Sequence, residues 1–555
     1  MTTMTGATMT GGQALVQQLK REGIDTIFGL PGIQLDWVFD ALFDERAHFK
    51  LHHPRHEQAC VYMADGYARA SGRIAVALMV PGPGLLNAAG ALSTAYAVSS
   101  PVFVVTGNIE TKNIDKGKGL LHEINDQLGM IAHVTKYQAL ARSPAEIPLL
   151  VHEAMRELTT GRPRPVEIEA PPDVYEAKAE IVLVDSVLHE RPGPDPDLVE
   201  RAARLLGAAK KPLIFAGGGV ISGGAWEELR RVAELLEAPV IQSANGKGAL
   251  SDRHPLSLPL RALPEVGPDA DAVLLVGTRF VQGLMSQVLQ PWVNGKTLVH
   301  LDIDASVIGS TYQTTVGIVS DAKKGLAAVA QALEKHNAIR ASRRDDLADL
   351  KRFLDEDARR QSPQADYAHA IREALPEDGA FVQESTQVGY WASQAFPVYQ
   401  PRTYFTSGYQ GTLGYGFATA LGVQVGLPGR KVVSINGDGG FAYNVMELAT
   451  MVEQKIPLTA VVFNDNAYGN VKRIQQMRFG GRTIASDLHN PDMMKLADAY
   501  GVEGRRVKSP AELKATLLDV FKRDDPVLIE APVGPMPPVN FKTRAQAQRP
   551  ASVSS

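Results

Sequence analysis

The sequence contains a single cysteine, Cys60, and this scarcity limits the sites that the chain can build. One cysteine cannot form a disulfide within the chain, and it cannot supply the thiolate cluster of a structural zinc site. Because disulfides persist mainly outside the reducing cytosol, their exclusion fits a cytoplasmic location. Cys60 lies in a predicted helix three residues after Glu57, and we interpret it as a small buried core residue.

An excess of one charge and long apolar runs are also missing. The formal net charge is −4 over 555 residues, so the composition gives no electrostatic reason to expect nucleic acid as a partner. No run of about 18 apolar residues is present to cross a membrane. Residues 1–12 lack the early Lys or Arg of a secretory or transit signal. We therefore expect a globular protein whose partners are neither membranes nor nucleic acids.

Two glycine-rich segments fall short of known nucleotide-binding motifs. Gly217-Gly218-Gly219 follows a predicted strand, but Ser222 occupies the last glycine position of G-x-G-x-x-G. Gly246-Lys247-Gly248 lacks the Ser or Thr that follows the lysine of a P-loop. Neither segment by itself predicts a bound nucleotide.

Predicted strands alternate with predicted helices along three stretches of similar size. Nearly unbroken apolar runs, such as residues 74–80 and 272–276, are typical of parallel strands that are buried on both faces. The alternation predicts an α/β protein with three doubly wound parallel-sheet domains. We place them at residues 10–175, 195–340 and 362–535, followed by a polar tail at 536–555. The charged stretch 335–360 is interpreted as a solvated helical connection.

Two turns in the third stretch have the chemistry of a phosphate and metal site. The predicted strand 432–436 runs into Gly437-Asp438-Gly439-Gly440, and the predicted strand 458–463 runs into the segment 464–470. In a parallel βαβ unit both turns lie at the same edge of the sheet. Glycine amides can approach a phosphate closely, and the carboxylates of Asp438 and Asp465 suit Mg²⁺. Gly-Asp-Gly alone would indicate only a tight turn; the second turn, 27 positions later, strengthens the prediction.

This pair of turns resembles the diphosphate and metal motif of thiamine diphosphate (ThDP) enzymes. Three α/β units in this order resemble the acetolactate synthase-like and 2-keto acid decarboxylase group over about residues 10–535. The resemblance implies Mg²⁺ held by Asp438, Asp465 and the carbonyl of Ala467, although many relatives carry Asn at the position of Asp465. It also implies that the first domain binds the pyrimidine and the third the diphosphate. The sites would lie between subunits of a homodimer or homotetramer.

The resemblance extends to other cofactor-binding positions. Arg55-His56-Glu57-Gln58-Ala59 resembles the stretch bearing the catalytic glutamate, so Glu57 would hydrogen-bond the pyrimidine and drive loss of the thiazolium C2 proton. Taken alone, Glu57 is better explained as a carboxylate at a helix start. The other implied cofactor contacts are Gly82 and Asn87 at the pyrimidine, Gly411 and Leu413 beneath the bent cofactor, and Thr386, Gln387, Gly437, Gly439, Gly440, Asn466, Tyr468 and Gly469 at the diphosphate.

The residues expected near the substrate depart from the synthase pattern. Leu121-His122-Glu123 stands where synthases have Phe-Gln-Glu, and it partly resembles the Leu-His-His of simple decarboxylases. His122 would relay a proton, or it is an ordinary surface histidine. Asn470 replaces an apolar Met, and Ile33 and Gln34 are expected to complete the pocket.

The resemblance leaves the reaction open among three functions. The first is decarboxylation or carboligation of a 2-keto acid. The second is cleavage of a 2-hydroxyacyl-CoA or decarboxylation of oxalyl-CoA, with the acyl-CoA held by the middle domain and the tail. The third is a catalytically silent binding subunit with a ThDP fold. FAD also stays an open question, because motifs similar to Gly217-Gly218-Gly219 and to residues 277–280 bind it in synthases, whereas the neighbouring loops differ.

Overall fold

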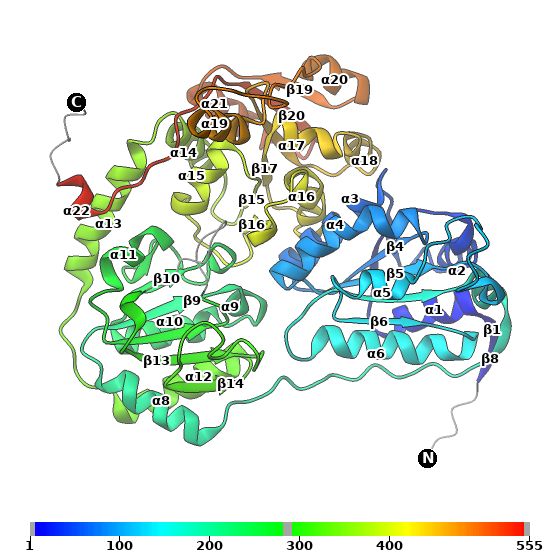
Figure 1. The fold of residues 1–555 in the computed structure, drawn as a ribbon, viewed down its shortest axis with the longest axis horizontal. Helices are drawn as coiled ribbons and strands as arrows, with labels where there is room; N and C mark the ends of the chain where they lie inside the picture. Colours follow the sequence, from blue (N-terminus) through cyan, green and yellow to red (C-terminus); the bar gives the residue numbers. More distant parts are fainter. Residues whose placement is uncertain (1–5, 281–290, 549–555) are drawn as a thin grey trace.

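The computed structural model describes residues 6–280 and 291–548, which form three domains, each built on a six-stranded parallel sheet (Figure 1). The predicted fold of three doubly wound α/β domains is confirmed, and Cys60 is buried as expected. Residues 549–555 of the predicted tail lie outside the described residues. Within residues 6–280 and 291–548, no helix combines the length and the apolarity needed to span a membrane.

The N-terminal sheet has the order β3-β2-β4-β5-β7-β6. Its strands are β2 (Thr26–Gly29), β3 (Lys50–His52), β4 (Ala75–Met79), β5 (Val102–Gly107), β6 (Tyr137–Leu140) and β7 (Val166–Ala170). One face is covered by α1 (Gly11–Arg21), α2 (Asp36–Asp44) and α6 (Ile147–Thr159), and the other by α3 (Glu57–Ser71), α4 (Pro83–Val98) and α5 (Gln127–Ile131). The short helix α7 (Pro172–Glu176) follows, and β1 (Ala7–Thr10) pairs antiparallel with β8 (Lys178–Ile181).

The middle sheet has the order β11-β10-β9-β12-β13-β14, which is 3-2-1-4-5-6 when counted from β9. Its strands are β9 (Pro212–Ala216), β10 (Val240–Gln242), β11 (Ser257–Leu258), β12 (Ala272–Val276), β13 (Thr297–Asp302) and β14 (Val316–Val319). Its helices are α8 (Pro196–Ala208), α9 (Gly218–Ser222), α10 (Trp226–Leu236), α11 (Leu263–Val266) and α12 (Ala322–His336). This order is that of dinucleotide-binding folds, in which ligands bind where the order reverses, here between β9 and β12.

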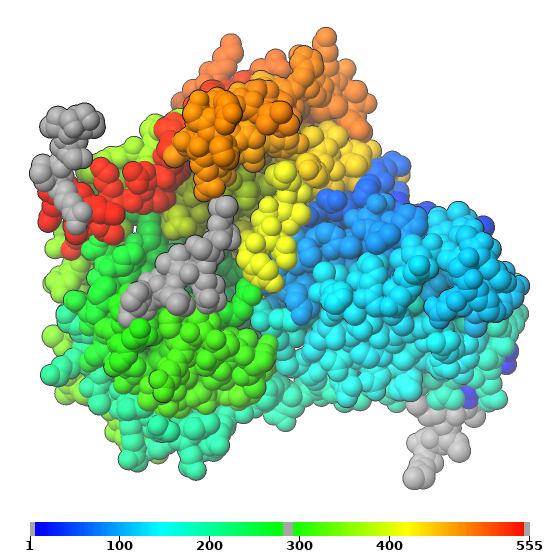
Figure 2. Space-filling view, in the orientation of Figure 1, coloured from blue at the N-terminus to red at the C-terminus, as the bar shows by residue number. Residues whose placement is uncertain are grey.

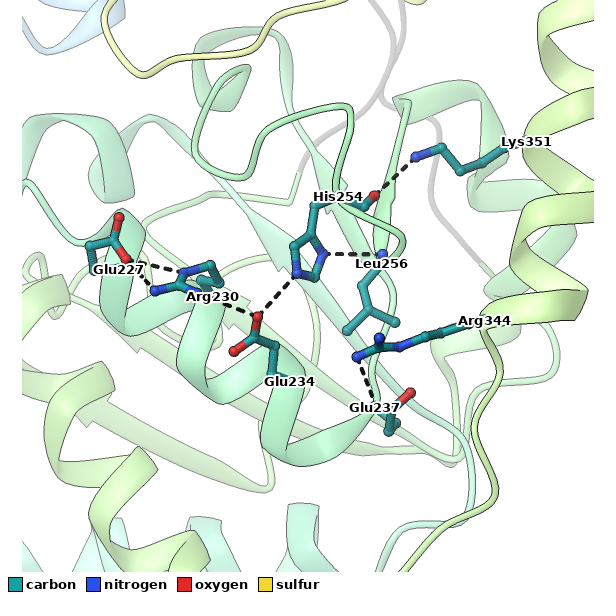
Figure 3. Close-up of polar contacts among 8 residues, drawn as sticks. All are labelled: Glu227, Arg230, Glu234, Glu237, His254, Leu256, Arg344 and Lys351. Carbon is teal, nitrogen blue, oxygen red and sulfur yellow. Dashed lines mark hydrogen bonds and ion pairs between the residues drawn. The ribbon is translucent and has the colours of Figure 1, made fainter.

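The charged stretch after the middle domain is not the solvated connection that we expected. It forms α13 (Arg344–Arg359), an amphipathic helix whose apolar side joins the core of the middle domain through Leu347, Leu350 and Leu354. Polar contacts add to this packing: Lys351 Nζ donates to the carbonyl of His254 at 3.0 Å, and Arg344 pairs with Glu237 at 3.4 Å (Figure 3). The high charge of the stretch therefore belongs only to the outer face of the helix.

The C-terminal sheet has the order β16-β15-β17-β18-β20-β19. Its strands are β15 (Ala380–Gln383), β16 (Tyr404–Thr406), β17 (Val432–Gly437), β18 (Thr459–Asn464), β19 (Glu503–Arg506) and β20 (Val527–Pro532). Its helices are α14 (Gln364–Ala374), α15 (Gln387–Ala395), α16 (Tyr415–Gly426), α17 (Asp438–Phe441), α18 (Glu447–Glu453), α19 (Gly469–Arg478), α20 (Met493–Tyr500) and α21 (Pro510–Val520). Counted from β2 and from β15, the N- and C-terminal sheets both run 2-1-3-4-6-5.

The N- and C-terminal domains share one hydrophobic core, which is formed where α3 packs on α16. These two helices occupy the same place in their domains, between the second and third strands. Their contact is reciprocal, since a Cβ on Gly66 would lie 2.1 Å from the carbonyl oxygen of Thr419, and one on Gly422 would lie 1.9 Å from that of Met63. Figure 2 shows the yellow part of the C-terminal domain lying directly against the blue part of the N-terminal domain.

The described part of the tail, residues 536–548, extends away from this contact and packs beside α13 and α14 (Figure 1). The backbone amide of Lys542 donates to Asp357 at 3.1 Å, and the amide of Arg544 donates to Glu265 at 2.7 Å. The tail ends in the short helix α22 (Arg544–Ala547).

Candidate active site

The predicted diphosphate residues come together at the carboxyl ends of β15, β17 and β18. α15 begins at Gln387 and is capped by Thr386, whose hydroxyl accepts from the amide of Gly389 at 3.0 Å. A Cβ on Gly469, the first residue of α19, would lie 2.3 Å from Asp465 Oδ2 and 2.9 Å from Gln387 Nε2. β15 and β17 also enclose the point where the strand order reverses, which is where open α/β sheets bind ligands.

The turn after β17 (437–440) packs against the turn after β18 (465–469), and together with the start of α15 these turns form a concave backbone surface that we call the cradle. A Cβ on Gly439 would lie 2.6 Å from the ring of Tyr468, so only a glycine lets the two turns approach. Gly440 packs in the same way against Glu384, whose oxygen would lie 2.5 Å from an added Cβ. Bare backbone amides beside the starts of α15 and α19 are suited to an anionic ligand such as a diphosphate.

Asp438 and Asp465 form a pair of neighbouring carboxyl groups beside the cradle. Burial, and then the charge of Asp438, raise the pKa of Asp465 to about 6, and burial also raises the pKa of Asp438. Asn490 Nδ2 donates to Asp438 and, at 3.0 Å, to Asn464. Two carboxylates that repel each other in this way would be stabilised by a divalent cation.

The donor set fits Mg²⁺ better than a softer metal. Mg²⁺ takes one or two carboxylates and completes its shell with phosphate oxygens and water. In the described part of the chain no group of three or more His, Cys, Asp or Glu side chains forms a metal cluster, so a protein-only cage is not offered there. The amide of Ala467 donates to Asp465. Its carbonyl as a third ligand stays a prediction.

The predicted pyrimidine residues meet in the N-terminal domain. Glu57 is the first residue of α3, and its Oε2 accepts from Asn87 Nδ2 at 3.0 Å. A Cβ on Gly84 would lie 3.4 Å from Glu57 Oε1, so Glu57 lies against the start of α4. Gly82 has a φ of +58°, and an added Cβ would lie 2.3 Å from the carbonyl oxygen of His122. Glycine is therefore required at position 82 by both its backbone angle and its contact.

Three of the four predicted substrate-pocket residues lie together with His122. Gln34 donates to the carbonyl of Leu121 at 3.3 Å, which leaves its Oε1 to accept from His122 Nδ1 at 3.0 Å. This bond places the proton on Nδ1, so Nε2 of the neutral ring is left as an acceptor. Ile33 and Leu121 are each 63% exposed. The fourth residue, Asn470, lies instead in the C-terminal domain on α19.

Gly411 and Leu413 lie in the C-terminal domain, in the segment that precedes α16. Gly411 is exposed with a φ of +58°, and Leu413 is half-buried. The next residue, Gly414, donates its amide to Glu384 at 2.6 Å, and its carbonyl accepts from Asn444 at 2.7 Å. These two hydrogen bonds fix the backbone directly after Leu413.

Sequence reasoning missed Glu384, Asn490 and Arg473. Burial raises the pKa of Glu384 to about 8; its Oε1 accepts from the amide of Gly414 at 2.6 Å, and its carboxyl group packs against Gly440. Asn490 orients Asp438 from a loop 52 positions away. No motif marks these residues; the one available signal was that Glu384 directly follows a buried strand, two residues before Thr386.

A cavity of about 630 Å³ lies where the three domains meet. It is lined by Gly218 and Arg279 of the middle domain, Arg162 of the N-terminal domain and Tyr390 and Gly411 of the C-terminal domain. The glycines of the incomplete motif have two roles. Gly217 and Gly219 let the loop after β9 pack on Gly277, whose atoms would lie 2.1 Å and 2.6 Å from their added Cβ atoms. Gly218, beside Asn245, and Gly219 also line the cavity.

Comparison with known proteins agrees with this geometry. Family models of thiamine pyrophosphate enzymes match all three domains: the N-terminal TPP binding domain at residues 9–130, the central domain at 199–329 and the C-terminal TPP binding domain at 384–531. The fold and its three domains are thus those of a thiamine pyrophosphate enzyme.

Whole-chain relatives narrow this class. The chain is 35% identical to a probable acetolactate synthase large subunit of Methanocaldococcus jannaschii, over 95% of this chain and 92% of the relative. It is 34% identical to a probable 2-ketoarginine decarboxylase of Pseudomonas aeruginosa, over 94% of each chain, and 31% identical to the acetolactate synthase isozyme 3 large subunit of Escherichia coli, over 93% and 92%. The chain belongs to the ThDP-dependent, acetolactate synthase-like family of lyases and transferases.

Proposed function

We propose that this enzyme uses ThDP and Mg²⁺ to break or form a C–C bond next to a carbonyl, decarboxylating a 2-keto acid and delivering the remaining unit to a proton or to a second carbonyl. The observation that carries the proposal is the Asp438–Asp465 pair beside the glycine cradle of Gly439 and Gly469. The relatives named as acetolactate synthases and as a 2-ketoarginine decarboxylase support the same chemistry.

The residues of the C-terminal domain would hold the charged end of the cofactor. Asp438, Asp465 and the Ala467 carbonyl would bind Mg²⁺. The dipoles of α15 and α19 favour negative charge at their first residues, so amides near Gly469 and the side chains of Thr386 and Gln387 would receive the diphosphate. When bound, ThDP supplies the stabilisation of negative charge that cleavage next to a carbonyl requires.

The residues of the N-terminal domain would manage protons. Glu57 would hold a proton at the pyrimidine ring, and its hydrogen bond from Asn87 fixes the direction of its carboxyl group. His122 would accept or return a proton at Nε2, because Nδ1 is held by Gln34. Leu413 would support the apolar side of the cofactor.

A second copy of the chain would complete each site in this proposal, as a homodimer or homotetramer. In the single chain Asn87 is exposed, Glu57 is half-buried and Leu121 is 63% exposed, which is unusual for residues that must exclude water from a reaction. α19 has no buried residue, and its Met477 is 74% exposed. Exposed apolar side chains beside two half-sites support a protein–protein contact there.

The cavity at the middle domain would bind a nucleotide-containing ligand. Its position at the β9–β12 reversal and its volume of about 630 Å³ both suit such a ligand. FAD is the first candidate, and the nucleotide of an acyl-CoA is the candidate of the alternative function. The absorbance spectrum of the purified protein tests the first, since bound flavin gives a yellow protein.

Product analysis with pyruvate, ThDP and Mg²⁺, with and without an added aldehyde, tests the proposed function. Acetolactate or a mixed acyloin would identify a carboligase, and free acetaldehyde would identify a decarboxylase. If pyruvate is not consumed, a panel of larger 2-keto acids and acyl-CoA thioesters is assayed next. Binding of ThDP without turnover of any of them would refute the enzyme proposal in favour of a silent binding subunit.

A further inference from the structure

Arg473 lies on α19, one helical turn beyond Gly469, and its guanidinium reaches toward α15. Nη1 donates to Gln387 Oε1 at 2.9 Å, and Nη2 donates to Asn470 Oδ1 at 2.6 Å. Asn470 is also hydrogen-bonded to Tyr390, which lines the central cavity. Arg473 is therefore placed between the phosphate cradle and the cavity.

The positive charge of Arg473 has no carboxylate partner among residues 6–280 and 291–548. Its contacts are two neutral side-chain amides, although Arg473 is half-buried. Arg506, in the same domain, shows the usual arrangement, pairing with Glu530 at 2.6 Å and with Asp492 at 2.9 Å. A half-buried arginine whose guanidinium has unused N–H donors can bind an oxyanion.

The cofactor diphosphate is not the best partner for this charge. Gln387 lies between Arg473 and the cradle: its Oε1 accepts from Arg473, and its Nε2 is 2.9 Å from the Cβ position of Gly469. The side-chain Nε2 of Gln387 therefore points toward the cradle. Arg473 orients this side-chain amide by donating to its Oε1. The remaining donors of Arg473 are left for a group outside the cradle.

The chemistry of decarboxylation restricts which anionic group Arg473 can usefully bind. In a decarboxylation the carboxylate next to the reacting carbonyl leaves as CO₂, and a guanidinium that held it would stabilise the ground state and slow the reaction. The useful partner is a carboxylate or similar oxyanion that the substrate keeps. Arginine binds such a group with two parallel hydrogen bonds, which gives geometric selectivity as well as charge.

We propose that Arg473 determines specificity by binding an anionic group remote from the reacting carbonyl, so that the enzyme prefers 2-keto acids with a second, terminal carboxylate. This inference rests on the proposed function. It also separates this chain from the relative named for 2-ketoarginine, because the guanidinium of that compound would be repelled by Arg473.

The test compares three 2-keto acids with the same five-carbon chain and different terminal charge: 2-oxoglutarate, 2-oxopentanoate and 2-ketoarginine. Wild-type kcat/KM should decrease in that order. With ThDP saturating, Arg473→Met should lower kcat/KM for 2-oxoglutarate roughly 10- to 100-fold and change that for 2-oxopentanoate little, as expected for loss of a charge-assisted hydrogen-bonded pair. Arg473→Lys should retain part of the preference. Arg478→Met, an exposed arginine on the same helix, is the matched control and should keep it fully.

Three results would overturn the inference. One is a wild-type enzyme with no preference among the three substrates. Another is an equal loss for all three in Arg473→Met. The third is a weakened ThDP affinity in that variant with unchanged substrate selectivity, which would show that Arg473 acts in cofactor binding.

A binding measurement separates failure of this inference from failure of the proposed function. If the ThDP-loaded enzyme turns over no 2-keto acid, calorimetry with the unreactive pair glutarate and pentanoate still reports on Arg473. Tighter binding of glutarate that is lost in Arg473→Met would support the anion site while the proposed reaction fails. Equal binding of the two would overturn the anion site itself.

Discussion

At the scale of single residues, two carboxyl groups in different surroundings are central to the proposed chemistry. Glu57 is half-buried, receives one hydrogen bond from Asn87 and begins a helix. Asp465 is crowded by Asp438, and its pKa rises to about 6 through burial and that neighbouring charge. In the proposed mechanism the first group would exchange a proton with a ligand, and the second would lose its proton when a cation binds.

Replacing Glu57 by Gln should remove the proton-exchanging group and leave the volume of the side chain unchanged. We expect turnover to fall by roughly 10²- to 10⁴-fold, the usual contribution of a general acid or base, with ThDP affinity largely retained. Steady-state rates and a ThDP titration measure the two effects. Glu153→Gln on the outer helix α6 is the control. Turnover within a few-fold of wild type would remove Glu57 from the mechanism.

The pKa of Asp465 predicts a pH dependence of metal binding. Because Mg²⁺ needs the ionised carboxylate, its affinity should be full above about pH 7 and should fall as the pH drops through about 6, approaching tenfold per pH unit below that value. Asp465→Asn keeps an oxygen ligand without a titrating proton, so its Mg²⁺-dependent ThDP affinity should vary less over this range. Calorimetric titrations at several pH values provide the measurement, and identical pH profiles would contradict the assignment.

At the scale of elements, the contact between α3 and α16 is the feature that holds the N- and C-terminal domains together. Gly66 and Gly422 bring the two backbones so close that no side chain fits at either position. The apolar residues around them belong to one core that spans both domains. The relative position of the domains is therefore fixed by packing rather than by the linker between them.

Gly422→Ala should destabilise the protein, because the new Cβ would lie 1.9 Å from the carbonyl of Met63 and the helices would have to separate. We expect a loss of about 1–3 kcal/mol in the free energy of unfolding, the range for overpacked cores. Chemical denaturation of both proteins measures it. Gly193→Ala, where an added Cβ meets nothing within 4 Å, is the control. An equal stability of the two variants would show that α16 can shift at little cost.

At the scale of the whole molecule, the candidate site is divided between domains. The residues proposed to bind the pyrimidine lie in the N-terminal domain, and the proposed metal ligands Asp438 and Asp465 lie in the C-terminal domain. In one chain Asn87 is exposed and Glu57 and Asp465 are half-buried, whereas Asp438 is buried. Assembly with a second copy would cover them, and symmetric dimers provide such a reciprocal contact.

Mixed subunits test this arrangement directly. Glu57→Gln and Asp438→Ala should each be inactive alone. In a mixed dimer with sites shared between subunits, one site carries both substitutions and the other carries neither, so about a quarter of wild-type activity should return after random mixing. If each site were built within one chain, every site would keep one defect, and mixing would restore no activity.

The sequence predicted the parts of this molecule that depend on local pattern. Buried strands followed by glycine and carboxylate turns gave the three α/β domains and the segments around Asp438 and Asp465. Glu384, Asn490 and Arg473 escaped prediction because their partners are set by tertiary packing and not by a motif. The burial of the α13 leucines was not predicted for a related reason: a helix with many charged residues can still bury one apolar stripe. Strand order likewise depends on contacts that no local pattern encodes.

The reciprocal packing of α3 on α16 has a consequence for the continuity of the chain. The segment 182–195 lacks regular secondary structure, and Leu188 within it is 99% exposed. A protease that cuts near Leu188 would leave the two fragments joined by the core they share, so they should still elute together in size-exclusion chromatography without denaturant. The enzyme could then be produced from two genes, one ending and the other beginning within this segment.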